Sequence, residues 1–215
     1  MMKLRGNSKK AYTANYYKNS KANKVHTLQE RRKLVGNKLS FAAAEAYKLL
    51  RTNLIFSMSD ERDCKIIGVT SALRGEGKSS TAINLAYTFA ETNKNVLLLE
   101  ADMRIPVVSK ILRLNNETLG LSNVLAGVNQ LNEAVQSSFL LKSLFVLPAG
   151  EIPPNPSELL SSVRMEQVLG MLSESFDYII VDLPPVNSVS DSLAVSKLLS
   201  GMVMVVRQNY CDQHS

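Results

Sequence analysis

An apolar run leads directly into a glycine-containing loop in the first half of the chain. The run is Ile66–Thr70 and the loop is Ser71–Ser80; the residues that follow carry apolar side chains at helical spacing, Ala82, Ala86 and Phe89. A strand, such a loop and a helix in this order are the context of a P-loop, whose glycines let backbone N–H groups turn toward phosphate oxygens. The segment therefore predicts the start of an α/β sheet with a phosphate site, although Ala72 replaces the first glycine of the usual motif. An ordinary glycine-rich turn between a strand and a helix is the alternative interpretation.

The candidate nucleotide-binding residues all lie in this loop: Arg74, Gly75, Glu76, Gly77, Lys78, Ser79 and Ser80. In a P-loop the lysine reaches the β- and γ-phosphates, and the hydroxyl that follows it is an oxygen ligand for Mg²⁺. We therefore expect Lys78 to contact phosphate, Ser79 to contact the metal, and the cofactors to be ATP and Mg²⁺.

Short apolar runs alternate with helical patterns over the rest of the chain. The runs are residues 65–70, 95–100, 144–148, 177–182 and 202–206, and the helical patterns are residues 39–57, 77–92, 107–114, 155–173 and 189–200. Strands that are apolar on both faces and alternate with helices are typical of a buried parallel sheet. The sequence therefore predicts an α/β fold of the P-loop NTPase type, a parallel sheet with helices on both faces.

Acidic residues end two of these predicted strands. Glu100 and Asp102 follow the run at 95–100, with Arg104 just beyond, and Asp182 ends the run at 177–182. Because the carboxyl ends of parallel strands meet at one edge of the sheet, we expect these acids to face the P-loop. A single acid at a strand end is often only a helix N-cap. Three of them beside a P-loop favour a site in which Ser79, Asp102 and Asp182 hold Mg²⁺ for phosphoryl transfer.

Charge is distributed very unevenly along the chain. Residues 1–40 contain eleven Lys and Arg and one acid, whereas residues 41–215 contain fourteen and eighteen. Residues 1–38 also lack apolar periodicity, so we expect a disordered basic tail followed by a domain at residues 39–215. Such a tail is attracted to anionic membranes or binds nucleic acid without specificity, or only keeps the chain soluble. No apolar run long enough to span a membrane and no signal peptide are found, which predicts a cytoplasmic protein.

Four blocks of the sequence resemble the bacterial tyrosine kinases of capsule and exopolysaccharide systems, the CapB/CpsD type. Ser71–Ser79 is similar to that family's Walker A motif, Leu97–Arg104 to its Walker A′ motif and Tyr178–Pro185 to its Walker B motif. The block Ala149–Leu160 is also similar, as is Glu45–Asn53 within the first predicted helix. The resemblance covers about residues 40–211 and includes the distinctive run Pro-Pro-Asn-Pro-Ser-Glu-Leu-Leu.

This resemblance implies an ATP:protein-tyrosine phosphotransferase that phosphorylates itself and regulates capsular or exopolysaccharide synthesis and export. It implies the catalytic residues Lys78, Glu100, Asp102, Arg104 and Asp182. Glu100 and Asp102 would orient the metal's waters and take the proton from tyrosine, whose hydroxyl is a poor nucleophile unaided. The implied partners are a transmembrane activator of the polysaccharide co-polymerase type, tyrosine-containing proteins and, through Glu45, Lys48 and Arg51, further copies of the chain. The implied location is the inner face of the cell membrane, with no specific nucleic-acid partner.

Three departures from the family pattern keep other interpretations open. Glu100 stands where the family usually has Asp, and Lys48 stands where its self-association motif has Arg. The match ends near Cys211, so we expect the kinase domain to be incomplete at its C-terminus and to lack the family's tyrosine-rich tail; Tyr12, Tyr16 and Tyr17 are the nearest substitute. The rivals are an ATPase of the MinD/ParA type, which has a lysine where this chain has Leu73, and an adaptor that binds nucleotide without turnover.

Overall fold

A single sheet with the strand order β3-β4-β2-β5-β1-β6 forms the centre of the computed structural model, which describes residues 27–58, 62–114, 118–187, 191–208 and 210. The strands are β1 (Lys65–Ser71), β2 (Val96–Glu100), β3 (Gln136–Ser137), β4 (Leu144–Leu147), β5 (Tyr178–Asp182) and β6 (Gly201–Val205). All neighbouring strands pair in parallel except β3, which pairs antiparallel with β4. The predicted sheet is thus confirmed, and the two-residue antiparallel edge strand β3, too short to show a period, was not predicted.

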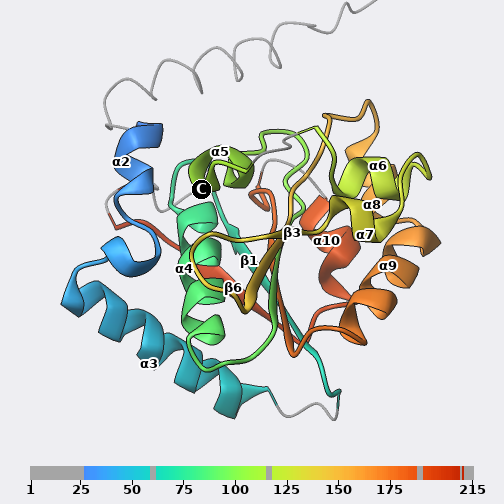
Figure 1. The fold of residues 1–215 in the computed structure, drawn as a ribbon. Coiled ribbons are helices and arrows are strands. Elements are labelled where there is room, and N and C mark those ends of the chain that lie inside the picture. Colours follow the sequence, from blue (N-terminus) through green and yellow to red (C-terminus); the bar gives the residue numbers. More distant parts are fainter. Residues whose placement is uncertain (1–26, 59–61, 115–117, 188–190, 209, 211–215) are drawn as a thin grey trace, which may run out of the picture.

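Helices cover both faces of this sheet (Figure 1). They are α2 (Leu28–Arg32), the 3-10 helix η1 (Gly36–Lys38), α3 (Phe41–Ser57), α4 (Lys78–Ala90), α5 (Val108–Leu112), α6 (Leu121–Leu125), α7 (Leu131–Ala134), α8 (Pro156–Leu160), α9 (Val163–Ser173) and α10 (Asp191–Ser196). Alternate strand residues point to opposite faces. Leu98 packs with α4 and α5 in one apolar cluster, whereas Leu97 and Leu99 pack with α6, α8 and α9 in the other. This double burial explains why the strands are apolar throughout.

The helix expected over residues 155–173 is two helices, α8 and α9. Ser162 separates the two helices, because its side chain accepts a hydrogen bond from the backbone N–H of Met165, which makes it the N-cap of α9. Ser40 caps α3 in the same way. The apolar period continues across the break, which is why it did not reveal two helices.

Residues 27–38 are structured, in contrast to the disordered tail expected up to residue 38. Thr27 and Glu30 form a capping box at the start of α2. Val35 is only 3% exposed and packs in the same cluster as α4. The apolar period is too short in this segment to be visible, and the order comes from contacts with α4 and α5. Residues 1–26 lie outside the described residues, so the expectation of disorder there is a prediction.

Strand β6 forms the edge of the sheet next to β1. Its side chains alternate, with Val203 packed on the α4 side and Met202 and Met204 39% and 49% exposed. In the part of the chain that the structure describes, no helix combines the length and apolarity needed to cross a bilayer.

Candidate phosphate and metal site

The loop between β1 and α4 has the backbone that a phosphate cradle requires. Gly75 and Gly77 have φ angles of 91° and 103°, in the left-handed region that side chains disfavour. A Cβ added at Gly77 would find no atom within 4 Å, so the space above the start of α4 is open. The two glycines predicted as loop residues are therefore required by the backbone.

Glu76 faces into the protein and stabilises the loop. Its carboxylate accepts hydrogen bonds from the backbone N–H of Leu73, at 2.6 Å, and of Arg207, at 3.3 Å. The segment after β6 thereby lies on the loop, where the Tyr210 hydroxyl donates to the carbonyl of Arg74 and the Arg207 guanidinium packs on the Tyr210 ring. Glu76, a predicted nucleotide contact, is 6% exposed and instead holds the protein's own backbone. Sequence reasoning missed Arg207 and Tyr210, because no motif marks them.

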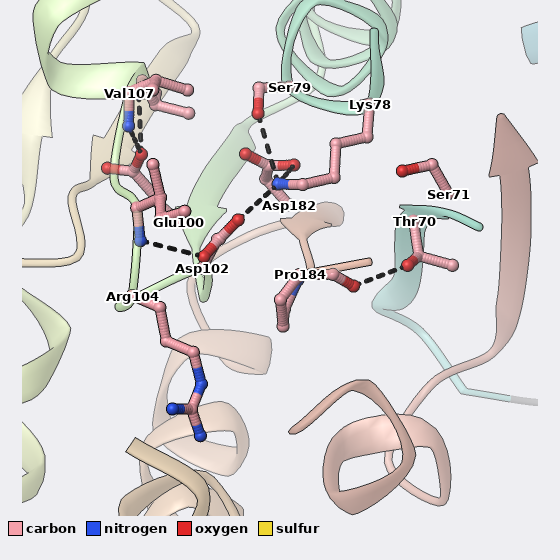
Figure 2. A network of polar contacts seen from close by, with 12 residues as sticks. Thr70, Ser71, Lys78, Ser79, Glu100, Asp102, Arg104, Val107, Asp182 and Pro184 are labelled. Atoms are coloured by element: carbon pink, nitrogen blue, oxygen red, sulfur yellow. Dashed lines mark hydrogen bonds and ion pairs between the residues drawn. The ribbon is translucent and has the colours of Figure 1, made fainter. Parts of the chain in front are cut away.

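Lys78 lies between two acids, Asp102 in the turn that follows β2 and Asp182 at the end of β5 (Figure 2). Its Nζ is 2.8 Å from Asp102 Oδ2 and 3.2 Å from Asp182 Oδ1, and 3.4 Å from Ser79 Oγ. Burial by itself lowers the pKa of Lys78, but the two carboxylates more than offset this and raise it. Lys78 is therefore a cation, and the convergence of Lys78, Asp102 and Asp182 predicted from the strand ends is confirmed.

Asp182 has the unfilled oxygen that a metal ligand needs. It is fully buried, and its Oδ2 has no hydrogen-bond partner in the structure. Burial raises the pKa of Asp182, and the Lys78 ammonium counteracts this. A buried carboxylate oxygen without a partner is costly, and a divalent cation is one group that satisfies it. The residues predicted to hold Mg²⁺, Asp182, Asp102 and Ser79, thus present oxygens of the kind that this ion prefers.

These oxygens do not by themselves form a complete metal cage. Among the described residues, no group of three or more His, Cys, Asp and Glu side chains is placed to hold a metal ion. Mg²⁺ usually keeps several waters and binds through one or two carboxylates together with substrate phosphates. The sparse donor set therefore fits an ion that arrives with a nucleotide.

Glu100 does not join this cluster, although β2 and β5 place it in register with Asp182. Its Oε1 accepts hydrogen bonds from the backbone N–H of Val107 at 2.5 Å and Val108 at 2.7 Å, and its Oε2 from Ala149 at 3.3 Å. Burial raises the pKa of Glu100 to about 7, although the backbone donors act against it. The role expected beside the metal does not match this geometry, because the longer side chain of Glu reaches the backbone at the start of α5.

Arg104 points away from Lys78, toward α8 and α10 (Figure 2). Its guanidinium forms two hydrogen bonds to the buried Asp191, at 2.8 and 3.1 Å, and one to Ser157 Oγ at 2.9 Å. In the same turn, Asp102 Oδ1 accepts a hydrogen bond from the Ile105 N–H. In this structure Arg104, which was predicted as catalytic, ties the turn carrying Asp102 to two helices. Sequence reasoning missed Asp191 and Ser157, and Ser157 lies in the distinctive Ala149–Leu160 block.

The residues predicted for self-association lie along α3. Glu45 and Lys48 are exposed and form an ion pair of 2.8 Å. Arg51 instead donates a hydrogen bond of 2.6 Å to the carbonyl of Thr88 in α4. The structure therefore leaves two of the three residues on the surface, and Arg51 helps to hold α3 on the domain.

Comparisons with known proteins extend these observations. Residues 64–211 match the family model AAA_31, an AAA domain. The chain is 43% identical over 163 residues to the tyrosine-protein kinase YwqD of Bacillus subtilis (strain 168), which covers 76% of this chain and 68% of YwqD. The kinase domain of Escherichia coli tyrosine kinase ETK superimposes with a TM-score of 0.77 and 34% identity over 83% of this chain and 69% of that one.

A more distant likeness concerns the fold alone. The septum site-determining protein MinD from Pyrococcus horikoshii OT3, solved with Mg-ADP, has a TM-score of 0.57 and 22% identity, and covers 66% of this chain and 58% of its own. At that identity the likeness shows a shared P-loop α/β architecture.

Proposed function

This chain belongs to the bacterial tyrosine kinase family, and on that premise we propose that it transfers the γ-phosphoryl group of ATP to tyrosine hydroxyls, its own included. The observation that carries the proposal is the Lys78 ammonium held between Asp102 and Asp182 beside the open space at Gly77. Phosphoryl transfer depends mainly on positioning and on neutralising phosphate charge, and this cluster supplies both.

The chain's own residues would divide the work as follows. The loop amides and Lys78 bind the phosphate chain, and Lys78 exchanges a carboxylate contact for a phosphate contact when nucleotide arrives. Ser79 and Asp182 would hold Mg²⁺, and the ion would neutralise the phosphate charge. Asp102, released from Lys78 in that exchange, accepts the proton of the tyrosine hydroxyl. Glu76 and Arg104 keep the loop and the Asp102 turn in place.

Label transfer tests this function. We expect the full chain, incubated with Mg²⁺, γ-phosphate-labelled ATP and a tyrosine-bearing protein, to place label on tyrosine, with more transfer when an activator fragment is added. Asp182→Asn should reduce the rate by about a thousandfold or more, because it removes the buried carboxylate that fits the metal. Asp177→Asn is the matched control, since Asp177 immediately precedes β5, at the end opposite to Asp182, in a partly exposed ion pair with Lys94.

Two other results would contradict the kinase function. ATP hydrolysis with ATP-dependent dimerisation and no label on tyrosine would indicate an ATPase of the MinD/ParA type. Tight Mg·ATP binding without hydrolysis or transfer, with and without activator, would indicate an adaptor. Circular dichroism without nucleotide should check that Asp182→Asn and Asp177→Asn are folded. A loss of activity in Asp182→Asn can then be distinguished from a failure to fold.

The partner assignments are part of the proposal and rest on family membership. They are a transmembrane activator of the polysaccharide co-polymerase type and a regulatory role in capsular or exopolysaccharide synthesis. Self-association would use Glu45 and Lys48, the exposed residues of the predicted set, with Arg51 holding α3 from behind. No specific nucleic-acid partner is proposed.

We also propose that the chain lies at the inner face of the membrane through its basic N-terminal segment. Residues 1–26 contain seven Lys and Arg and no acid. Each basic residue near an anionic surface contributes about 1 kcal/mol, screened by salt. Removing residues 1–26, which leaves α2 intact, should therefore abolish a salt-sensitive co-sedimentation with phosphatidylserine vesicles. Equal sedimentation of the full and the shortened chain would contradict membrane attachment through this segment.

A further inference from the structure

Two turns carry the acids on either side of Lys78. Asp102 lies in the turn that follows β2, and Asp182 ends β5 directly before the second turn. The backbone joins the two turns where they begin, because the Asp182 carbonyl accepts hydrogen bonds from the N–H groups of Ala101 and Asp102, at 2.9 and 3.1 Å. The contacts that hold each turn further along the chain therefore affect where the two carboxylates lie.

The start of α10 holds the first turn through Asp191. This side chain is 1% exposed, and its carboxylate accepts two hydrogen bonds from the Arg104 guanidinium, at 2.8 and 3.1 Å, and one from the Ser157 hydroxyl of α8. Burial by itself raises the pKa of Asp191, but the hydrogen bonds from Arg104 and Ser157 more than offset this and lower it. Asp191 is therefore an anion, and a guanidinium bound through two of its donors is fixed in direction as well as in position.

The next residue of α10 holds the second turn. Ser192 is fully buried, and its hydroxyl donates a hydrogen bond of 2.6 Å to the Pro184 carbonyl. The buried Thr70 hydroxyl of β1 donates to the same carbonyl at 2.7 Å, as Figure 2 shows. Because Asp191 and Ser192 are consecutive, one end of α10 is bonded to both turns.

We propose that Asp191 is a positioning residue for phosphoryl transfer: through the Arg104 guanidinium it fixes the turn that carries Asp102 beside the P-loop lysine. Ser192 supports it by holding the turn that follows Asp182 to the same end of α10. Asp102 has a short side chain and lies two residues before Arg104, so its carboxylate follows the backbone of this turn. The inference rests on the proposed function, since it adds residues that act on the same site.

Asp191→Asn keeps the size of the side chain and removes the charge that binds Arg104. We expect it to lower kcat for label transfer by about tenfold to a hundredfold, because a small misplacement of a reacting group is costly. The KM for Mg·ATP should not rise, because the loop amides and Lys78 bind the phosphates. Asp177→Asn, which removes a charge from a partly exposed ion pair, is the matched control and should change neither constant.

A double variant tests whether the effect passes through Arg104. Arg104→Gln, Asp191→Asn and Arg104→Gln/Asp191→Asn should all lose about the same kcat, because each breaks the same pair and the pair can be broken only once. Losses that multiply in the double variant would show that the two residues act separately and would overturn the inference.

Urea unfolding of the nucleotide-free chain gives a readout that does not depend on activity. Lys78→Met should lower the urea midpoint by less in the Asp191→Asn background than in the wild type, because Asp102 can then turn away from the site toward water. In the Asp177→Asn background the shift should equal that in the wild type. Equal shifts in all three backgrounds would mean that Asp191 does not act on Asp102, and the inference would be wrong.

Ser157→Ala keeps the inference testable if Asp191→Asn does not fold. It removes two hydrogen bonds around the Arg104–Asp191 pair and leaves the pair itself, so kcat should fall by about threefold with no rise in KM. Ser161→Ala is its control, because Ser161 is exposed at the end of the same helix and donates only to carbonyls of α8. Rates are compared at a temperature at which circular dichroism shows each variant to be folded. A fall no larger than that of Ser161→Ala would contradict the inference.

The failures of the two proposals are distinguishable. If the wild type labels tyrosine and Asp191→Asn labels it at the same rate, the inference about Asp191 is wrong and the kinase function stands. If the wild type only hydrolyses ATP, the kinase function is wrong, and the inference stands or falls with the dependence of hydrolysis on Asp191. A wild type that turns over no nucleotide also removes the kinase function, and the urea midpoints then decide whether Asp191 positions Asp102.

Discussion

Lys78→Met should lower the free energy of unfolding by about 3 to 5 kcal/mol near neutral pH and should abolish phosphoryl transfer. The stability loss follows from burial: Asp182 is fully buried and Asp102 is 5% exposed, and both rely on the Lys78 ammonium as their cation. Removing that cation leaves two facing carboxylates in a site with little access to water. The loss of transfer follows because methionine puts no positive charge at the position of the Lys78 Nζ, where the phosphate chain would bind.

Denaturant unfolding at two pH values checks the cause. Burial already raises the pKa of Asp182, and loss of the nearby ammonium raises it further, so the acid can take up a proton as the pH falls. The destabilisation should therefore be smaller near pH 5 than near pH 8. The double variant Lys78→Met/Asp182→Asn, which removes one of the two charges, should recover part of the stability. A stability equal to that of the wild type at both pH values would show that the three side chains are not coupled.

Glu100→Gln should remove a pH dependence of stability of the order of 3 kcal/mol, the free-energy equivalent of a pKa raised from 4.5 to about 7. Burial makes ionisation of this carboxyl costly in the folded chain, whereas the unfolded chain ionises it freely. Between about pH 4.5 and 7 the folded state therefore binds the proton more tightly, and the free energy of unfolding of the wild type falls as the pH rises through this window.

Urea unfolding of the wild type and Glu100→Gln, from about pH 5 to pH 8, measures this difference. The wild type should lose stability across the range, and the variant should lose less. The variant should also have a lower free energy of unfolding by an amount that does not depend on pH. The reason is that the NH₂ group of the Gln side chain would face the Ala149 N–H, so that two donors meet. Glu166→Gln, at an exposed position paired with Lys197, is the control and should follow the wild type. Parallel curves for wild type and Glu100→Gln would contradict a raised pKa at Glu100.

Much of the site follows from local signals in the sequence. The apolar run before Ser71 and the helical period after Lys78 predicted a strand and a helix, and the structure has β1 and α4 there. Parallel strands end at one edge, so Asp102 and Asp182 were expected to meet Lys78, and they do. These predictions succeeded because each depends on spacing along the chain or on a rule that holds for all sheets of this type.

Predictions about long side chains were less successful. Glu100 and Arg104 lie on the predicted segment, yet Glu100 bonds the backbone of α5 and Arg104 bonds Asp191. The ordered segment at residues 27–38 was missed as well, since it is held by Asn84 and Lys110 and shows no period of its own. Each of these depends on donors and acceptors that are more than about five residues away along the chain.

The sequence by itself determined the five parallel strands, the P-loop and the acids that meet Lys78. Backbone period and glycine placement act locally, and a short Asp side chain stays close to the backbone that positions it. Only the tertiary structure decided where the flexible Glu and Arg side chains point and that α2 packs against α5. A long charged side chain goes to whichever opposite charge or unpaired backbone group folding brings within reach, and that neighbourhood exists only in the assembled fold.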